Sequence, residues 1–286
     1  MNAPKSEESF GQSVWLFFIL TFAVSWLFWI PLAASGEEVP LAVLVIGAFS
    51  PSIFGVLMTY RTKGKEGRAE FWRSLFGFGR IGLVWYAVIL LLFPMVMALT
   101  FLLESVLGGE IPSLEGAREI LTQPVALLVF IITMLIGGPL AEELGWRGFA
   151  LDRLQAKWSA LSASLVLGVI HAAWHLPLFF AVGTSQELMG FVTGLFWLWV
   201  IQVVTGSIFF TWIYNNNQRS ILSAVLIHFM SNATFTIIAQ LGGALPLRTE
   251  IIRTVITVAL AVIVVFVWGF KTMAKQPSGQ SASKIV

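Results

Sequence analysis

The stretch from Ile81 to Leu103 reads IGLVWYAVILLLFPMVMALTFLL and contains no charged residue. A helix that crosses a bilayer needs about 20 mainly apolar residues. The strands of a membrane barrel would instead be about 10 residues long and would alternate in polarity, and this stretch does not alternate. Because lipid offers no hydrogen-bonding partner, the backbone has to satisfy its own N–H and C=O groups. The segment is therefore predicted to be a membrane-spanning helix.

The rest of the chain has the same character. Of its 286 residues, 57% are hydrophobic and 11% are charged, whereas ordinary globular proteins have about 45–50% and 25%. Too little polar surface remains to cover a water-soluble fold. The sequence therefore predicts an all-α polytopic membrane helical bundle of about eight transmembrane helices. The seven further spans are Val14–Ala33, Leu41–Tyr60, Gln123–Trp146, Ser159–Ala181, Leu188–Tyr214, Ile221–Leu241 and Ile251–Phe270.

Basic residues are distributed unevenly about these spans. With the N-terminus inside, all but three of the 17 lysines and arginines fall on the inner side, as they do in cytoplasmic loops generally. The exceptions are Arg118, Arg248 and Arg253. We therefore expect a multi-pass protein of the cell membrane with both termini in the cytoplasm. The chain lacks an ER-retention ending, which favours a prokaryotic plasma membrane, and its polar tail from Lys275 to Val286 is expected to be disordered.

Composition also excludes some classes of function. A net charge of +2 from 17 basic and 15 acidic residues gives no reason to expect a nucleic-acid partner. Cysteine is absent, which excludes disulfides, a thiolate nucleophile and Cys-ligated zinc. The bilayer itself is the first partner that the sequence predicts.

Ionisable side chains inside the spans are costly, by about 2.5–3.5 kcal/mol each, and point to a function. The first three predicted spans hold none, whereas spans four, five and seven hold an acidic pair and all three histidines. The sequence AEELGWR, residues 141–147, closes span four at its cytoplasmic end. On a helix Glu143 and Arg147 face each other, while Glu142 points about 100° away. One carboxylate is thus left free to act as a general base.

Two further pairs share a helix face because their members are four residues apart. His171 and His175 in span five have a spacing that suits a metal or the lining of a cavity. His228 and Asn232 in span seven can both donate hydrogen bonds to an oxyanion. Each pair is also compatible with plain packing or an interhelical hydrogen bond. From the rise of a helix, the clusters lie about 8–18 Å from the cytoplasmic ends of their spans, so we expect one inward-facing cavity.

Together the three signatures resemble the CAAX-protease and bacteriocin-processing (CPBP) family of intramembrane proteases, which includes the type II CAAX endopeptidases. The family pattern is Glu-Glu-x-x-x-Arg, then Phe-x-x-x-His, then His-x-x-x-Asn. Glu142-Glu143 with Arg147 fits the first motif, and His228 with Asn232 fits the third. The second motif departs from the pattern, because Leu167 stands four residues before His171. The matching region runs from span four to span seven, under half of the chain.

The resemblance implies an intramembrane endopeptidase, and it assigns roles by position. Glu142 would activate water as the general base, aided by His171. His228 and Asn232 would bind the oxyanion of the tetrahedral intermediate. The family is described both as metalloproteases and as metal-free enzymes, so the cofactor is either none or zinc. If zinc is present, Glu142, His171 and His228 would supply three ligands and leave a position open.

The supporting residues implied by the resemblance are Glu143 and Arg147, with His175 orienting His171 or the substrate, or simply packing. A peptide or membrane-protein substrate is expected, either a prenylated CAAX tail or another peptide. The regions expected are 1–120 as an N-terminal three-helix membrane region, 121–245 as the catalytic core, and 246–286 as a final transmembrane helix with a disordered cytoplasmic tail.

Two alternatives to a protease stay open. A proton-coupled transporter would also carry intramembrane Glu and His, although many transporters have paired halves and here the polar groups occupy one half only. An immunity or adaptor protein would keep the scaffold without hydrolysis.

Overall fold

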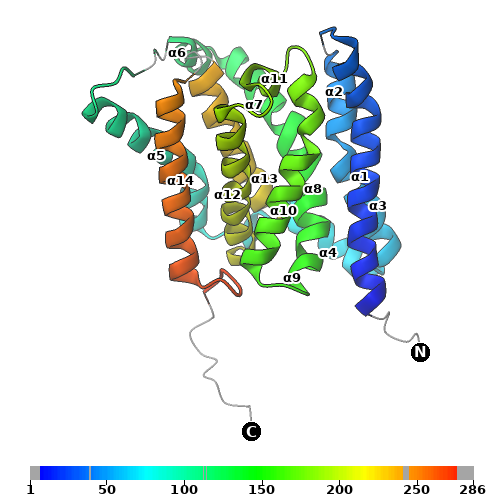
Figure 1. Ribbon diagram of the computed structural model, residues 1–286. Helices are drawn as coiled ribbons and strands as arrows, with labels where there is room; N and C mark the ends of the chain where they lie inside the picture. The colour runs from blue at the N-terminus through cyan, green and yellow to red at the C-terminus, as the bar shows by residue number, and fades with distance from the viewer. Residues whose placement is uncertain (1–6, 39, 112, 114, 241–244, 276–286) are drawn as a thin grey trace, which may run out of the picture.

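The structure is a computed structural model that describes residues 7–38, 40–111, 113, 115–240 and 245–275. These residues form helices and turns and contain no strand. The helices stand side by side as a bundle, and α1 begins at the same end of the bundle at which α14 finishes (Figure 1). The all-α fold expected from the sequence is thereby confirmed.

Eight helical segments of the described chain are long and apolar enough to cross a membrane, which confirms the predicted number. Most of their ends lie within a few residues of those expected. The segments are Ser13–Ser35, Leu41–Thr62, Leu83–Val106, Pro124–Gln155, Ala160–Phe180, Gly194–Asn216, Ile221–Ile238 and Leu247–Trp268. In labelled helices these are α1 (Glu7–Ser35), α2 and α3 (Leu41–Ala48, Ser50–Thr62), α5 (Leu83–Val106), α7 to α9, α10 with η4 (Ala160–Trp174, Leu176–Phe180), α12 (Gly194–Asn216), α13 with η5 (Ile221–Phe235, Thr236–Gln240) and α14 (Leu247–Trp268).

Short elements mark the two ends of the bundle. At the end where α1 begins, helix α4 (Lys65–Phe76) and the turn η1 (Phe78–Arg80) connect the second span to the third. At the opposite end lie α6 (Glu115–Thr122) and α11 (Ser185–Met189), as Figure 1 shows. We call these the α4 end and the α11 end of the bundle.

The fourth span is longer than predicted. It runs from Pro124 to Gln155 rather than stopping at Trp146, through α7 (Pro124–Leu135), the π-helical turn η2 (Ile136–Leu140), α8 (Ala141–Gly145), a second π-helical turn η3 (Trp146–Leu151) and α9 (Asp152–Gln155). The expectation that the acidic pair ends the span is therefore wrong. The helix continues because the arginines that seemed to mark its end are buried and bonded inside the protein: Arg153 donates to the carbonyl of Phe149 and to Thr62, both at 2.8 Å.

Helix α8 is held close to α3 by glycines. A side chain on Gly145 would start only 2.2 Å from the carbonyl oxygen of Pro51, and one on Gly55 would start 2.6 Å from the Cα of Gly145. Small residues at such a crossing let two backbones approach in a membrane, where packing is the main force between helices. The second span thus supports the segment that carries the acidic pair.

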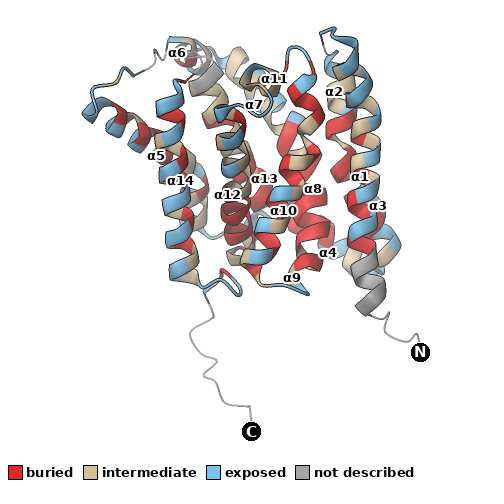
Figure 2. Cartoon of the chain, in the orientation of Figure 1, coloured by how far each residue is buried: buried red, intermediate tan, exposed pale blue. Residues whose placement is uncertain are grey.

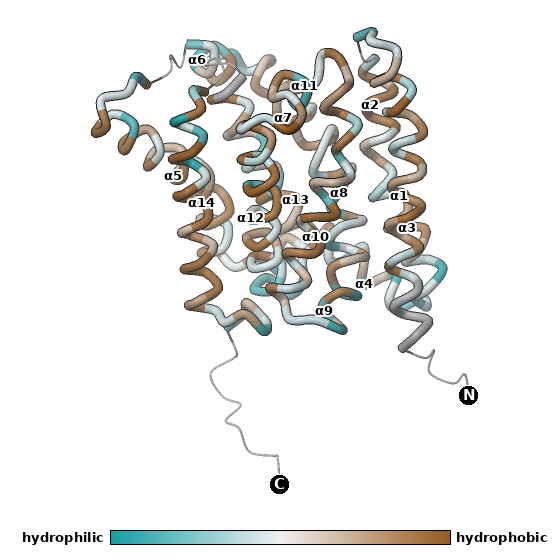
Figure 3. Tube along the Cα trace, in the orientation of Figure 1, coloured by the Kyte–Doolittle hydropathy of each residue, from teal (hydrophilic) through white to brown (hydrophobic). Residues whose placement is uncertain are grey.

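Apolar side chains fill the inside of the bundle and also cover its outside. Figure 2 shows buried residues concentrated on α8, α10 and α13, and Figure 3 shows that the outer helices remain largely hydrophobic. Large apolar residues on the outside, such as Leu83 and Phe266, are 87% and 89% exposed. A surface of this kind suits contact with lipid rather than water.

The division into 1–120, 121–245 and 246–286 stays a prediction. Contacts cross the first proposed boundary, since Phe17 on α1 stacks edge-to-face on Trp146 of the fourth span at 5.6 Å. The tail beyond Lys275 lies outside the described residues, as do Lys5 and residues 241–244.

Candidate active site

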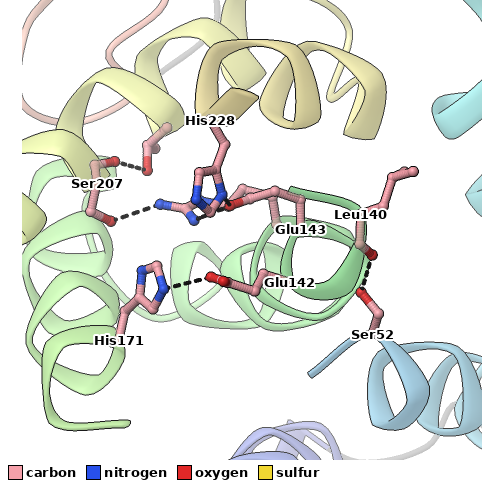
Figure 4. Close-up of polar contacts among 9 residues, drawn as sticks. Ser52, Leu140, Glu142, Glu143, His171, Ser207 and His228 are labelled. Atoms are coloured by element: carbon pink, nitrogen blue, oxygen red, sulfur yellow. Dashed lines mark hydrogen bonds and ion pairs between the residues drawn. The ribbon is translucent and has the colours of Figure 1, made fainter. Parts of the chain in front are cut away.

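Glu142 and Glu143 lie on α8, between the two π-helical turns, and both are buried. A π-helical turn breaks the regular backbone pattern and is frequent at functional sites. Here Ser52 on α3 donates a hydrogen bond of 2.8 Å to the carbonyl of Leu140, the last residue of the first π turn. Figure 4 shows the result: the two glutamates extend toward different partners.

Glu142 meets His171 of α10. Its Oε2 lies 2.7 Å from Nε2 of His171, and both side chains are at least nine-tenths buried. The imidazole sits among aromatic rings, with Trp146 at 5.4 Å and Trp174 at 6.0 Å between ring centroids. A carboxylate and an imidazole are thereby held together in a largely dry place.

Glu143 is the centre of a second contact network. It accepts two hydrogen bonds from Nη1 of Arg147, at 2.8 and 3.1 Å, and its Oε1 lies 2.7 Å from Nδ1 of His228 on α13. The guanidinium of Arg147 also donates to Ser207 at 3.2 Å and lies over the ring of Phe210 at 4.7 Å. The pairing of Glu143 with Arg147, which the four-residue spacing predicts, is present, and Glu142 is left to His171.

Gly138 in the first π turn marks the place where the two networks meet. If the glycine carried a Cβ, that atom would be 2.9 Å from Nδ2 of Asn232, 3.9 Å from Oε1 of Glu142 and 4.0 Å from Nε2 of His228. A free carboxylate oxygen, an imidazole nitrogen and a carboxamide therefore surround one small space. The structure brings Glu142, His228 and Asn232 together, although they come from two different spans.

Known proteins resemble this chain in the region that contains these residues. A family described as "Type II CAAX prenyl endopeptidase Rce1-like" matches residues 124–234, a range that contains every polar residue of the two networks. A protein named CAAX prenyl protease 2, from Methanococcus maripaludis, is 28% identical over 241 residues, which cover 81% of this chain and 87% of the relative. Both comparisons support the resemblance to the CPBP family of intramembrane proteases. The chain is accordingly a multi-pass membrane endopeptidase that acts on a peptide substrate.

One position of this chain differs from the family motif. Leu167, which stands where the motif has Phe, is fully buried in a hydrophobic core to which the first, second and fourth to seventh spans and α4 contribute. An apolar side chain thus packs at this position, one helical turn before His171.

His175 lies one turn beyond His171 and contacts it. Its Nδ1 is 3.0 Å from the carbonyl oxygen of His171, and the two rings are 4.9 Å apart. Among the described residues, Glu142, His171 and His175 form a trio whose possible ligand atoms all lie within 4.8 Å of one another. That trio shares Glu142 and His171 with the predicted set and has His175 in place of His228.

The protein has a cavity of about 590 Å³ beside these networks. Arg147, His171, Ser207, His228 and Asn232 line its inner end. The rest of the lining comes from α5, α11, α12, α13 and α14, and much of it is apolar: Phe93, Val96, Met97, Leu188, Met189, Leu195, Trp199, Val203, Phe210, Phe235 and Leu245. A peptide with apolar side chains matches such a lining.

The cavity does not face the end of the bundle that the depth estimate suggests. Of the described residues that line it, only Gly183 and Leu188 are exposed, and both lie at the α11 end. Toward the α4 end the space is filled instead: Phe71, Phe149 and Ile221 are at most 2% exposed. The expected opening toward the termini is thus corrected. The rise of a helix gives the depth of a residue along its span. It does not show at which end of the bundle the side chains of neighbouring helices close the cavity.

Some cavity residues were missed by sequence reasoning. Glu250 was not singled out in the sequence, and Arg253 was counted only as an outer-side base. Both lie in the first two turns of α14, where Arg253 donates to Glu250 at 2.6 Å. Gln202 of α12 joins them through Thr254, also at 2.6 Å. Their signal was an acid and a base three residues apart at the start of an apolar run. For Gly138 and Ser207 the sequence offers no such signal.

Proposed function

We propose that the protein hydrolyses its peptide substrate with a water molecule that Glu142 activates and His171 assists. The observation that carries the proposal is the 2.7 Å contact of buried Glu142 with His171, which lines the inner end of the cavity. A general base has to be within hydrogen-bond reach of the proton that it takes. The second oxygen of Glu142, Oε1, borders the space beside Gly138, and a water molecule in that space would lie within its reach.

In the first step the water attacks the scissile carbonyl carbon, and its proton passes to Glu142. The Nε2–H of His171 holds the carboxylate through this transfer. The carbonyl oxygen becomes an oxyanion, which accepts hydrogen bonds from the Nδ2–H of Asn232 and from the Nε2–H of His228. In the second step the intermediate collapses, the C–N bond breaks, and Glu142 returns the proton to the leaving amine. One preorganised donor of this kind contributes about 10²–10³ in rate.

Glu143 and Arg147 act as positioning residues in this proposal. In this proposal the ring of His228 carries both of its protons. The carboxylate of Glu143 accepts the Nδ1–H at 2.7 Å and so directs the Nε2–H toward the Gly138 space. Arg147 compensates the buried charge of Glu143 and is itself held by Ser207. A buried carboxylate without such a partner would be costly.

A test of Glu142 uses the purified protein and a quenched fluorescent peptide that ends in a prenylated CAAX sequence, as suggested by the relative's name. We expect Glu142→Gln to lower kcat by about 10³-fold or more, because the amide cannot accept the proton. Glu70→Gln, on the surface of α4, is the matched control and should cleave like the parent. Equal turnover of Glu142→Gln and parent would contradict the proposed base.

The peptide sequence is a separate question, and we propose to identify it by trapping. Membranes of the native host that carry Glu142→Gln should retain uncleaved substrate that the parent protein removes. An immunity protein, an adaptor or a transporter would leave the membrane peptides of the two strains identical. We place the protein in the cell membrane for this experiment.

We propose a metal-free reaction. The donors Glu142, His171 and His175 fit three zinc ligands by distance, and zinc would supply a water of lowered pKa. Yet Glu142 and His171 already face each other at 2.7 Å, and two ligands of one tetrahedral zinc, each about 2.0 Å from the metal, would stand further apart.

His175→Gln distinguishes the two versions, because it keeps a polar side chain but removes a third ligand. We expect the variant to retain most of its kcat, the parent to survive a zinc chelator, and elemental analysis to find less than one zinc per chain. Loss of activity on chelation, with recovery on adding zinc, would contradict the metal-free reaction.

A further inference from the structure

The direction in which the catalytic cavity opens has a consequence for the substrate. From the networks at its inner end, the lining leads along the upper parts of α12, α13 and α14 to α11. Its two exposed described residues are Gly183 and Leu188, and Leu188 is 81% exposed. The mouth of the cavity therefore lies at the α11 end.

The opposite side of the networks is closed by packing. A Cβ on Gly148 would lie 2.8 Å from the side chain of Ile221 and 2.9 Å from the ring of Phe71. Phe149, one residue on, is fully buried. No room is left between these described side chains for a peptide to reach Glu142 from the α4 end.

The two ends of the bundle also differ in charge. The described lysines and arginines at the α4 end are Arg61, Lys63, Lys65, Arg68, Arg73, Arg80, Arg153, Lys157, Arg219, Lys271 and Lys275. Those at the α11 end are Arg118, Arg248 and Arg253, and two of these pair with Glu104 and Glu250. Basic residues gather on the cytoplasmic side of membrane proteins. By this rule the α4 end is cytoplasmic and the α11 end faces outward.

We propose that the protease receives its substrate from the extracytoplasmic side of the membrane. Its substrate is then a peptide segment exposed at the outer face, in an exported or membrane-anchored polypeptide, and not a cytoplasmic tail. The inference rests on the proposed function for the assignment of the cavity as the peptide site. It adds the side of entry, which neither the motifs nor the relative's name supplies.

The absence of cysteine from the chain makes a direct test possible. Leu188→Cys and Ser185→Cys place single thiols at the mouth, and Lys157→Cys places one on an exposed position at the α4 end. Intact cells are treated with a membrane-impermeant maleimide before and after permeabilisation. We expect the two mouth thiols to be labelled in intact cells and Lys157→Cys only after permeabilisation. The reverse pattern, with mouth thiols reached only after permeabilisation, would overturn the proposal.

Cleavage by the same variants tests whether the mouth is the entrance. Full modification of Leu188→Cys with a bulky maleimide should remove most of its cleavage of the prenylated peptide, relative to the same variant unmodified. Modification of Lys157→Cys should leave cleavage unchanged. Undiminished cleavage by fully modified Leu188→Cys would show that the peptide enters elsewhere.

Failure of this proposal and failure of the proposed function are separable. Labelling does not need catalysis, so Leu188→Cys combined with Glu142→Gln should be labelled like Leu188→Cys alone. If Glu142→Gln cleaved normally while labelling followed the expected pattern, the base would be wrong and the orientation right.

Discussion

Gly138 matters to the site because it carries no side chain. The position that a Cβ would occupy is bordered by groups from Glu142, His228 and Asn232. These are the three side chains assigned to the water and the oxyanion. The nearest, Nδ2 of Asn232, would be 2.9 Å from an added Cβ, closer than real side-chain carbons come to a neighbour. Asn232 would therefore have to move.

We predict that Gly138→Ala lowers kcat by about 10²-fold, the effect of one lost oxyanion donor, while the midpoint of thermal unfolding stays the same or rises slightly. Alanine is a better helix former than glycine by about 1 kcal/mol. Gly137→Ala is the matched control, because nothing lies within 4 Å of its Cβ position. Activity in Gly138→Ala equal to that in Gly137→Ala would remove the space from the mechanism.

The motifs predicted the residues of the site better than they predicted its surroundings. The four-residue spacings in Glu143–Arg147 and His228–Asn232 fix a shared helix face, so these pairs follow from sequence alone. The contact of His228 with Glu143 joins helices 85 positions apart in the chain. Spacing within one helix carries no information about it, and only the packing of α13 against α8 reveals it.

At the level of elements, the fourth span differs most from a simple hydrophobic helix. Its length was underestimated because hydropathy treats Glu142, Glu143 and Arg147 as a boundary. In the structure these residues are buried: Glu143 pairs with Arg147, and Glu142 contacts His171. Its two π-helical turns were not predicted at all. Gly137, Gly138 and Pro139 weaken a regular helix, but which irregular turn follows depends on neighbours such as Ser52, which bonds the carbonyl of Leu140.

The crossing of α3 and α8 should tolerate no added atom. A Cβ on Gly145 would lie 2.2 Å from the backbone of Pro51, and backbone cannot move aside as the end of a side chain can. We predict that Gly145→Ala lowers both the unfolding midpoint and the activity, since overpacking costs about 1–3 kcal/mol. Measured beside Gly137→Ala, it separates a packing defect from the purely catalytic loss expected for Gly138→Ala. Unchanged unfolding of Gly145→Ala would mean that the two helices are less closely packed.

For the molecule as a whole, the span count follows from hydropathy because lipid demands about 20 apolar residues of each crossing. The arrangement of the spans does not, since their outer faces are apolar as well. The region that matches the family begins at residue 124, yet the structure ties it to the first span. Trp174, beside His171, donates to Ser25 at 2.7 Å, and Trp26 donates to the carbonyl of Trp174 at 3.0 Å.

We predict that a chain lacking residues 1–36 is inactive and poorly folded in detergent, because Trp146 and Trp174 lose the side chains that cover them. Ser25→Ala is the milder variant, which should lower stability by about 1–3 kcal/mol by leaving the Trp174 N–H without its partner. Removal of the residues after Lys275 serves as the control and should leave cleavage intact. Normal cleavage by the chain without its first span would show that residues 124–234 suffice.

The packed layer of Phe71, Phe149 and Ile221 also separates the site from the α4 end of the bundle, which bears on ion leakage. Hydrolysis brings water far below the lipid surface, and a wet path through the remaining thickness would let protons run down their gradient. Moving one elementary charge across 100 mV is worth about 2.3 kcal/mol. The membrane voltage falls mainly across the part of the protein that water does not enter. A closely packed apolar layer, such as Phe71, Phe149 and Ile221 form, is what a hydrolase inside a membrane needs in order to hold water on one side without conducting ions to the other.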